Sequence, residues 1–163
     1  METNFYGAVR ITQKALPFVL KANGTIVAVS SVIGKVPVPG RSAYSCSKHA
    51  LESFFETLNM ELTEKDITIL TLRPSYTKTN TRKNAVIGDG SLQGFSTLDE
   101  NELLPANKAA NQIMTAIYKK KNGYTLGKKM EGSWLIKLYQ LFPNKISKLI
   151  YKNLKQEKHS LFD

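Results

Sequence analysis

The stretch TIVAVSSVIGKVPVPGRSAYSCSKHAL, residues 25–51, decides the fold class. Residues 25–30 form a β-branched run without polar alternation, which is typical of a strand buried on both faces of a parallel sheet. Glycine and proline recur through residues 32–42, so an exposed loop is predicted there. Over residues 43–64 apolar side chains return at spacings of three and four, which predicts a long helix.

The segments on either side continue an alternation of helices and strands. Apolar residues at helical spacing predict a helix over residues 4–21, and Gly24 supplies a stop after it. Residues 67–72 form a second apolar β-branched run, which Arg73 and Pro74 are expected to stop. Helix, strand, helix and strand in this order are typical of an α/β protein with a parallel sheet.

The second half of the sequence is less regular. Residues 80–104 have no clear period and contain several glycines, so a loop excursion is expected after the second strand. Helical spacing returns over residues 107–121, and residues 124–126 predict a short edge strand. Two short amphipathic helices are expected on either side of Pro143.

Cysteine content and hydropathy indicate the compartment. Cys46 is the single cysteine, so no intramolecular disulfide can form and a reducing compartment is expected. We expect Cys46 to be a small buried side chain rather than a reactive thiol. Neither a signal-peptide pattern nor a run of about 18 apolar residues occurs, which predicts a cytoplasmic protein.

Tyr44 and Lys48 are the first candidates for chemistry. They lie four residues apart on a predicted helix, so their side chains share one face. The spacing alone is common, and on most helices such a pair is simply solvated. Here the helix follows a loop that begins after Ser30 and Ser31, at the end of a buried strand. Because open α/β sheets bind ligands at the carboxyl ends of their strands, these side chains predict one site.

These residues carry a resemblance to a known family. Residues 29–34, VSSVIG, and 44–51, YSCSKHAL, closely resemble the active-site block of the short-chain dehydrogenase/reductases. Residues 4–7, NFYG, are similar to that family's Asn-containing helix motif, and residues 73–79, RPSYTKT, to its Pro-Gly loop. The Ser-Ser-x-x-Gly-Lys run and the Trp-containing basic C-terminus are most similar to hydroxysteroid dehydrogenase-like and other lipid-carbonyl members.

The resemblance implies a fold class and a domain division. We expect the C-terminal part of a Rossmann-like, doubly wound parallel sheet, with residues 1–127 as its catalytic part. Residues 128–163 would form a basic amphipathic helical extension. The family's chain begins with a strand, a Gly-rich turn and a helix that receives the pyrophosphate, and no such turn occurs in this sequence. The dinucleotide-binding half is therefore expected to be missing, which predicts a partial product and an open edge at the strand 25–30.

The same resemblance implies catalytic roles. Ser31 and Tyr44 would bind the substrate oxygen, whereas Ser30 would be structural. Hydride delivery to a carbonyl builds negative charge on its oxygen, which hydroxyl donors stabilise and protonate. A free phenol titrates near pH ~10, so the ammonium of Lys48 must favour the phenolate if Tyr44 is to act as a base at neutral pH. Lys48 would also bind the nicotinamide ribose, and Asn4 would position a water in a proton relay behind it.

The loop after the second strand is implied to pass over the nicotinamide. Pro74 would lie at the ring, the backbone of Tyr76 and Thr77 would meet the carboxamide, and the Thr79 hydroxyl would lie near the phosphates. For Thr79 the alternative is an ordinary helix cap. Ser75 replaces the family's usual glycine, which restricts positive φ. The implied cofactor is NAD or NADP, with NADP slightly favoured.

The net charge of +10 is concentrated in the C-terminal third of the chain. Residues 1–107 hold 11 basic and 10 acidic side chains, whereas residues 108–158 hold twelve lysines and two glutamates. The C-terminal lysines lie opposite an apolar stripe, as in an interfacial amphipathic helix. Two interpretations follow: the helix caps the substrate pocket, or residues 128–158 contact a membrane surface peripherally.

Other partners are disfavoured or implied by resemblance. Lysine without interleaved arginine and aromatic readers argues against nucleic acid. The two histidines join no cysteine or paired carboxylates at ligand spacing, so no metal site is predicted. In the family the two long helices, here 4–21 and 43–64, commonly form a dimer interface, so the complete protein is expected to be a homo-oligomer.

Two hypotheses for the function therefore stand side by side. The first is an NAD(P)-dependent oxidoreductase that interconverts an alcohol and a carbonyl on a small hydrophobic, lipid- or steroid-like substrate. The second is a catalytically inert truncated product that acts at most as an interaction or membrane-surface fragment. An encoded Gly-rich turn upstream of Met1 would separate them.

Overall fold

A three-stranded parallel sheet forms the centre of the fold. Its strands are β1 (Thr25–Val29), β2 (Thr68–Pro74) and β5 (Tyr124–Leu126), in the order β1-β2-β5. The structure is a computed structural model that describes residues 1–86, 89–96, 98–127 and 131–155. The sheet confirms the α/β fold class predicted from the sequence.

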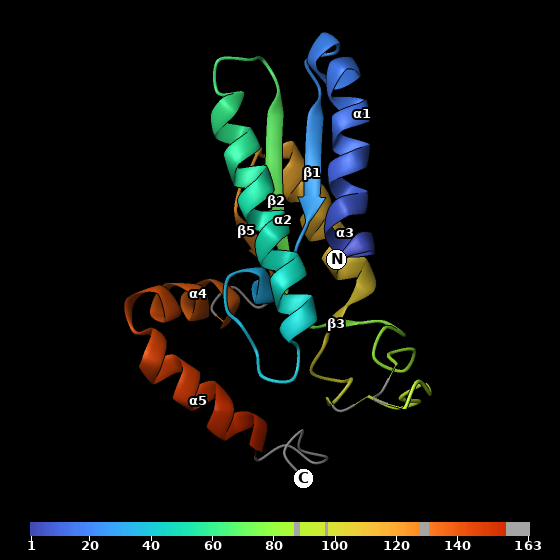
Figure 1. The fold of residues 1–163 in the computed structure, drawn as a ribbon, viewed down its shortest axis with the longest axis vertical. Coiled ribbons are helices and arrows are strands. Elements are labelled where there is room, and N and C mark those ends of the chain that lie inside the picture. The colour runs from blue at the N-terminus through green and yellow to red at the C-terminus, as the bar shows by residue number, and fades with distance from the viewer. Residues whose placement is uncertain (87–88, 97, 128–130, 156–163) are drawn as a thin grey trace.

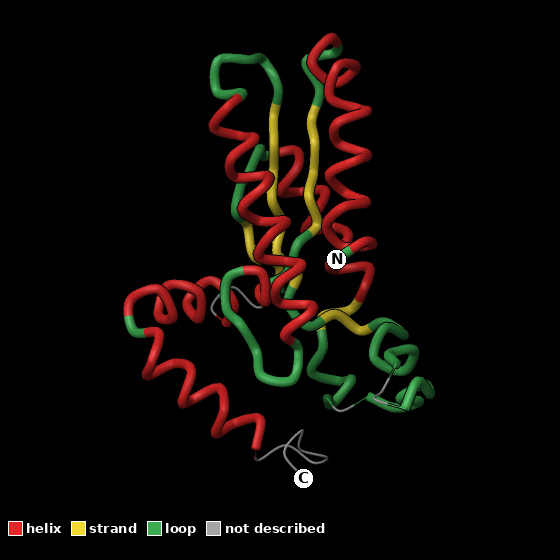
Figure 2. The backbone as a smooth tube through the Cα atoms, viewed as in Figure 1, coloured by secondary structure: helices red, strands yellow, loops and turns green. Residues whose placement is uncertain are grey.

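Helices cover both faces of this sheet. They are α1 (Gly7–Lys21), α2 (Ser42–Glu61), α3 (Ala106–Tyr118), α4 (Glu131–Leu141) and α5 (Pro143–Lys155), with a π-helical turn at Glu2–Tyr6 before α1 and a 3-10 turn, η2, at Val32–Gly34. In Figure 1, α2 lies in front of β2 and α3 lies behind the sheet. Figure 2 shows the strands as the middle layer between these helices.

Side-chain alternation along the strands produces two apolar clusters, one on each face. Toward α2 the buried cluster consists of Ala28, Leu51, Phe55, Leu58 and Ile69, with side chains of α1 packed against it. Toward α3 it consists of Leu70, Leu72, Ala116 and Leu126. Ile69 and Leu70 are adjacent in β2 yet belong to opposite clusters, so a one-residue slip of the strand would exchange the two faces.

The predicted long elements are confirmed with small changes in their ends. The first helix begins with the π-helical turn, and the second spans Ser42–Glu61 instead of 43–64. The expectation that Arg73 and Pro74 stop the second strand is wrong, because both belong to β2 and pair with β5. Pro74 has no amide hydrogen to give, and the amide of Ser75 donates to the carbonyl of Leu126 instead (3.1 Å).

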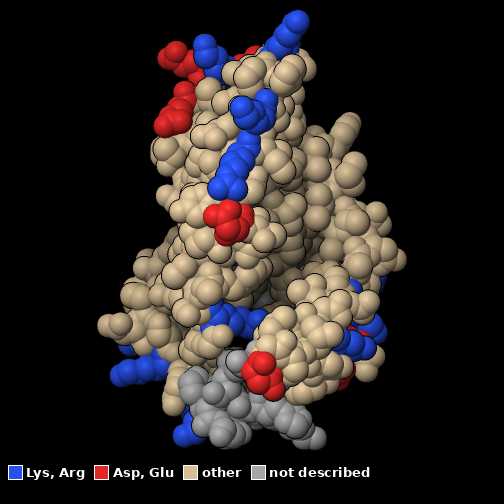
Figure 3. Space-filling model, turned by 45° about the vertical axis from the view of Figure 1, so that its right-hand side comes forward, with Lys and Arg blue, Asp and Glu red and all other residues tan. Residues whose placement is uncertain are grey.

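β1 lies at the edge of the sheet. In the described part of the chain it pairs with β2 alone, so the predicted open edge is present. Its two end residues are exposed, Val29 by 48%, and the expectation of a strand buried on both faces is therefore wrong here. Ile11 and Phe18 of α1 are also exposed, and the face shown in Figure 3 carries a row of charged side chains beside a wide uncharged surface.

The segment between β2 and α3 contains two very short strands. β3 (Thr77–Lys78) pairs in parallel with β4 (Leu104–Pro105), and the excursion between them holds an isolated antiparallel bridge between Val86 and Leu92. The sequence did not predict β3 and β4, because strands of two residues show no periodicity. Their pairing brings the end of the excursion back beside the residues that follow β2.

Two further findings concern exposure and the membrane. Cys46 is exposed, so the expectation of a buried side chain is wrong. On α2 its neighbours Ser45 and Ser47 point inward, which leaves Cys46 on the solvent side of the helix. Within the described ranges, none of the helices has the length and apolar character needed to span a membrane.

Candidate active site

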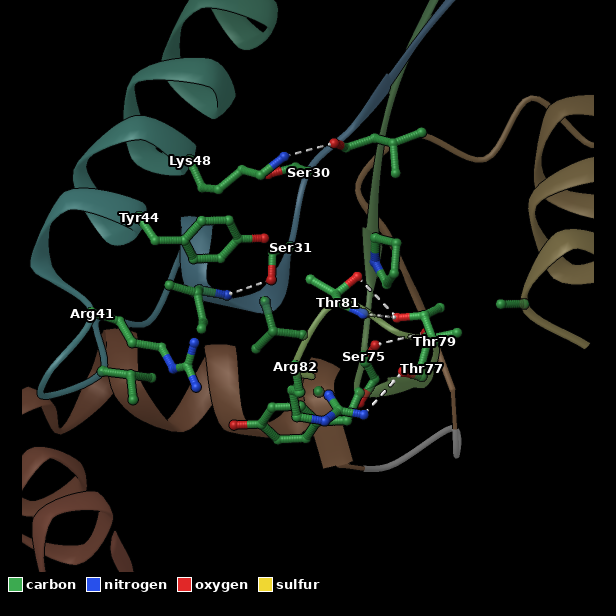
Figure 4. A pocket seen from close by; sticks show the side chains of 18 of the residues that line it. Ser30, Ser31, Arg41, Tyr44, Lys48, Ser75, Thr77, Thr79, Thr81 and Arg82 are labelled. Carbon is green, nitrogen blue, oxygen red and sulfur yellow. Dashed lines mark hydrogen bonds between the residues drawn. The ribbon is translucent and has the colours of Figure 1, made fainter. Parts of the chain in front are cut away.

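A cavity of about 880 Å³ opens at the carboxyl ends of β1 and β2. Its walls come from the turn after β1, the start of α2, the loop after β2, and parts of α3, α4 and α5. The predicted site residues that line it are Ser31, Tyr44, Lys48, Pro74, Tyr76, Thr77 and Thr79. Asn4 is the predicted residue that does not. Figure 4 shows the labelled side chains converging on this space.

The two serines after β1 have different environments. The amide of Ser30 donates to the carbonyl of Leu72 (2.7 Å), which continues the β1–β2 ladder, and the Ser30 Oγ is buried with no hydrogen-bond partner. Ser31 caps the η2 turn by accepting from the amide of Ile33 (3.3 Å). In Figure 4 the hydroxyl of Tyr44 points toward Ser31. Ser31 and Tyr44 can therefore both meet one oxygen atom of a substrate.

The side chain of Lys48 reaches from α2 to the end of β1. Its Nζ donates to the carbonyl of Val29 (3.1 Å) and lies 5.8 Å from the centroid of the Tyr44 ring. Burial lowers the pKa of Lys48 from its ordinary value, because the ammonium loses hydration, while the negative charge of Glu52 acts in the opposite direction. The ammonium thus lies beside the phenol ring that it is expected to activate.

Asn4 contacts α2 and does not line the cavity. Its Nδ2 donates to the Oγ of Ser47 (3.1 Å), and that hydroxyl donates to the backbone carbonyl of Tyr44 (2.8 Å). Asn4 belongs to the π-helical turn, a geometry that is rare and often found at functional sites. The structure therefore links Asn4 to the backbone that carries Tyr44 and Lys48, and its role in a water relay stays a prediction.

The loop after β2 forms the wall opposite Tyr44. Thr77 Oγ1 donates to the carbonyl of Ser75 (3.0 Å), and Thr79 Oγ1 donates to Thr81 Oγ1 (3.0 Å). Ser75 has no positive φ, so its replacement of glycine strains nothing. The conformational freedom is needed at Gly127, where φ is +121° and an added Cβ would lie 2.9 Å from Ser75 Cβ.

Several lining residues escaped the sequence reasoning. Arg41 and Arg82 both point into the cavity in Figure 4, and Arg82 also donates to the carbonyl of Thr77 (3.1 Å). Among the described residues that line the cavity there are three cations, these two and Lys48, and no carboxylate. The position of Arg41 directly before the helix of Tyr44 was the one available signal. Arg82 lies in a segment without any sequence pattern.

The C-terminal helices contribute to the same cavity. Gly132 and Leu135 of α4 and Leu154 of α5 line it. A Cβ on Gly132 would collide with Thr125 of β5 and approach Val32 (3.2 Å), so glycine lets α4 lie against the strand and the η2 turn. Within the described ranges, no group of three or more His, Cys, Asp or Glu side chains is placed to hold a metal ion.

Comparisons with known proteins find similar chains of one family. The family model for the short chain dehydrogenases matches residues 1–89. Dehydrogenase/reductase SDR family member 7B of Xenopus laevis is 46% identical over 102 residues, which cover 62% of this chain and 31% of that protein. The Bos taurus protein of the same name is 36% identical over 161 residues, which cover 98% of this chain and 49% of that protein. The chain thus spans about half or less of these relatives.

The fold is similar to that of solved dehydrogenases. A short chain dehydrogenase from Burkholderia cenocepacia, in complex with NADP, has a TM-score of 0.73 at 16% identity. The match covers 92% of this chain and 56% of that one. At this identity the likeness shows the fold alone, which is the Rossmann-like fold predicted from the sequence. Taken with the family model, which covers more than half of the residues, it shows that the chain belongs to the short-chain dehydrogenase family.

Proposed function

We propose that this chain carries the catalytic part of an NAD(P)-dependent oxidoreductase that interconverts an alcohol and a carbonyl. The observation that carries the proposal is the convergence of Ser31, Tyr44 and Lys48 at one cavity at the ends of parallel strands. Hydroxyl donors beside a partly buried ammonium are suited to a reacting oxygen that gains negative charge. The family membership supports the same chemistry.

The three side chains have distinct roles in this proposal. In reduction, Tyr44 donates its hydroxyl proton to the substrate oxygen while Ser31 donates a hydrogen bond to that oxygen. In oxidation, Tyr44 accepts the proton. Lys48, which is held 5.8 Å from the Tyr44 ring by its bond to Val29, stabilises the negative charge that tyrosine carries without its proton. Asn4 holds the helix backbone through Ser47.

The residues around the cavity fit a nicotinamide dinucleotide. Lys48 offers a donor for ribose hydroxyls, and the hydroxyl of Thr79 and the guanidinium of Arg82 suit phosphate oxygens. A cavity lined by cations without a carboxylate favours a negatively charged cofactor. The bound dinucleotide would supply or accept the hydride. We favour NADP over NAD slightly; solved proteins of the same fold include complexes with NADP and with NADH.

The substrate is proposed to be a small hydrophobic, lipid- or steroid-like alcohol or carbonyl. Beyond the catalytic residues, the cavity wall is largely apolar, with Val36, Leu98, Ile113, Leu135 and Leu154 among its members. An apolar wall with a few polar groups at one end is typical of sites that orient a hydrophobic ligand by one oxygen.

Fluorescence titration with NADH and NADPH tests this function. The measurement uses residues 1–163 beside a protein extended upstream to any encoded Gly-rich turn. We expect the extended protein to bind NADPH and Lys48→Met to weaken that binding at least tenfold, because a charge-assisted hydrogen bond is lost. Lys65→Met, a remote lysine on the turn before β2, is the matched control. Failure of the extended protein to bind either dinucleotide would remove the proposal.

We propose further that α4 and α5 contact an anionic membrane surface. Trp134 near the beginning of α4, and Leu141 and Phe142 at the junction of the two helices, are at least half exposed, and the lysines of α5 are exposed. Exposed apolar side chains beside lysines suit the boundary between lipid headgroups and acyl chains. Such a contact would bring a lipid-soluble substrate to the cavity that α4 and α5 line. The proposed localisation is therefore cytoplasmic, with peripheral contact to a membrane.

Vesicle sedimentation tests the membrane contact. The probe is a vesicle of phosphatidylcholine with phosphatidylserine, compared with phosphatidylcholine alone. Replacing the four lysines of α5, Lys145, Lys148, Lys152 and Lys155, by glutamine is expected to weaken binding at least tenfold, because each lysine near an anionic surface contributes about 1 kcal/mol. The control replaces Lys119, Lys120 and Lys121 after α3. Equal binding to both vesicles, or no binding, would contradict the proposal.

A further inference from the structure

Glu52 is a buried carboxylate one helical turn behind Lys48. It follows Lys48 by four residues and Tyr44 by eight on α2, so the three side chains share one face of the helix. Only 1% of Glu52 is exposed. A carboxylate removed from water is costly unless it is paired and hydrogen-bonded, so its partners must be accounted for.

Arg73 at the end of β2 is the main partner of Glu52. Its Nε donates to Oε1 (3.0 Å) and its Nη2 donates to Oε2 (2.6 Å), which is a two-point guanidinium–carboxylate contact. Arg73 is itself 8% exposed, and its Nη1 donates to the carbonyl of Gly123 (2.7 Å). Lys35 lies 3.8 Å from Glu52 and 2.6 Å from the half-exposed Glu56. Glu56 therefore joins the same network at its solvent-exposed side, through Lys35.

Lys35 and Arg73 adjoin segments that line the cavity, and Gly123, which Arg73 contacts, leads into β5. Lys35 directly follows the η2 turn that Ser31 caps, Arg73 directly precedes Pro74, and Gly123 directly precedes β5. The packing is equally close, since a Cβ on Gly34 would lie 2.8 Å from Glu52 Cγ and 3.0 Å from the carbonyl of Lys48. Through Arg73 and Lys35, the carboxylate of Glu52 holds α2 against the end of β2 and against the turn that Ser31 caps.

Glu52 also acts on Lys48 electrostatically. Burial lowers the pKa of Lys48 and the charge of Glu52 opposes this change. The other charged groups around Glu52 are Lys35, Arg73 and Glu56, and of these only Glu56 is also negative. Glu56 is the more exposed carboxylate, so its field is weakened by water. Glu52 is therefore the carboxylate through which the network reaches the catalytic lysine.

We propose that Glu52 is a positioning residue of the active site, which stabilises the positive charge of Lys48 and connects α2, the end of β2 and the η2 turn. The proposal rests on the proposed oxidoreductase function, because a positioning role requires that Lys48 takes part in the reaction. The contacts of Glu52 are independent of that function. Glu52 needs no contact with substrate or cofactor for this role. A purely structural ion pair would affect the stability of the fold and leave the titration of Lys48 unchanged.

The test follows the titration of Lys48 by NMR in the full chain labelled with ¹³Cε-lysine. The resonance of Lys48 is assigned by its loss in Lys48→Arg. In Glu52→Gln the pKa of Lys48 is expected to fall below that of the wild type, and in Glu52→Asp, which keeps the charge, most of the fall is expected to be absent. Glu56→Gln, in the same network, is the matched control and is expected to change the titration less.

An unchanged Lys48 titration in folded Glu52→Gln would overturn the proposal. If that variant does not fold, the double variant Glu52→Gln/Arg73→Gln removes both buried charges and leaves neither unpaired; the pKa of Lys48 is expected to fall there too, and no fall overturns the proposal. No substrate or cofactor enters the measurement. A failure here is thus distinct from a failure of the oxidoreductase function, which would appear in the NADPH titration.

Discussion

Tyr44→Phe is expected to lower the rate of NADPH-dependent ketone reduction by about 10²–10⁴-fold, the usual contribution of a positioned general acid. The substitution removes the one hydroxyl that points toward Ser31 in the cavity and leaves the ring that packs beside Lys48. NADPH binding is expected to change far less than turnover. The measurement is loss of NADPH absorbance with a panel of lipid-soluble ketones, in the upstream-extended protein.

Tyr118→Phe is the control for this loss. Tyr118 lies on α3 with 89% of its surface exposed, so its hydroxyl reaches no part of the cavity. The control should retain the wild-type rate. A Tyr44→Phe protein that reduces the same ketones at the wild-type rate would show that another group delivers the proton, and the assignment of Tyr44 as acid and base would be wrong.

Gly34→Ala is expected to lower the free energy of unfolding by about 1–3 kcal/mol, the range for overpacking in a close-packed interior. The added Cβ would lie 2.8 Å from both Ser30 Oγ and Glu52 Cγ and 3.0 Å from the carbonyl of Lys48. Two of these are held firmly, because Lys48 O belongs to a helix backbone and Glu52 is paired with Arg73. The turn that carries Ser31 must therefore move away from α2.

Urea unfolding followed by circular dichroism measures this effect. Gly7→Ala, at the start of α1, is the matched control, because its added Cβ meets one backbone oxygen, Glu2 O, at 3.3 Å. Alanine also favours helix by up to about 1 kcal/mol over glycine, so little loss is expected there. Equal unfolding midpoints for Gly34→Ala and the wild type would show that the turn and the helix have more room than the structure indicates.

The long helices and strands could be predicted because their residue types follow regular patterns. The apolar positions of α2 recur at helical spacing, and residues 25–30 and 67–72 are short runs rich in β-branched residues. The errors occur where tertiary contacts override local pattern. Arg73 continues β2 because Glu52 and Gly123 hold its guanidinium, and Cys46 is exposed because its neighbours Ser45 and Ser47 turn inward.

The candidate site could be predicted where chemistry is concentrated in short motifs. Ser31, Tyr44 and Lys48 lie within eighteen residues of sequence, and a single strand-loop-helix unit brings them together. Arg82 comes from a segment far along the chain, and only the folded structure shows that it reaches the same cavity. Glu52 was not predicted as a site residue, because a carboxylate on a helix is ordinarily solvated and its position in the sequence does not reveal that it is buried.

The cavity wall contributed by α5 has a consequence for the timing of synthesis. Leu154 lines the same space as Val29, so the wall is not complete until α5 has been made. Synthesis proceeds from the N-terminus, so β1, α2 and β2 emerge well before α5. Tyr44 and Lys48 can therefore be in place on a nascent chain whose cavity is still open on one side. A nascent chain therefore encloses a hydrophobic ligand only after α5 has emerged and folded.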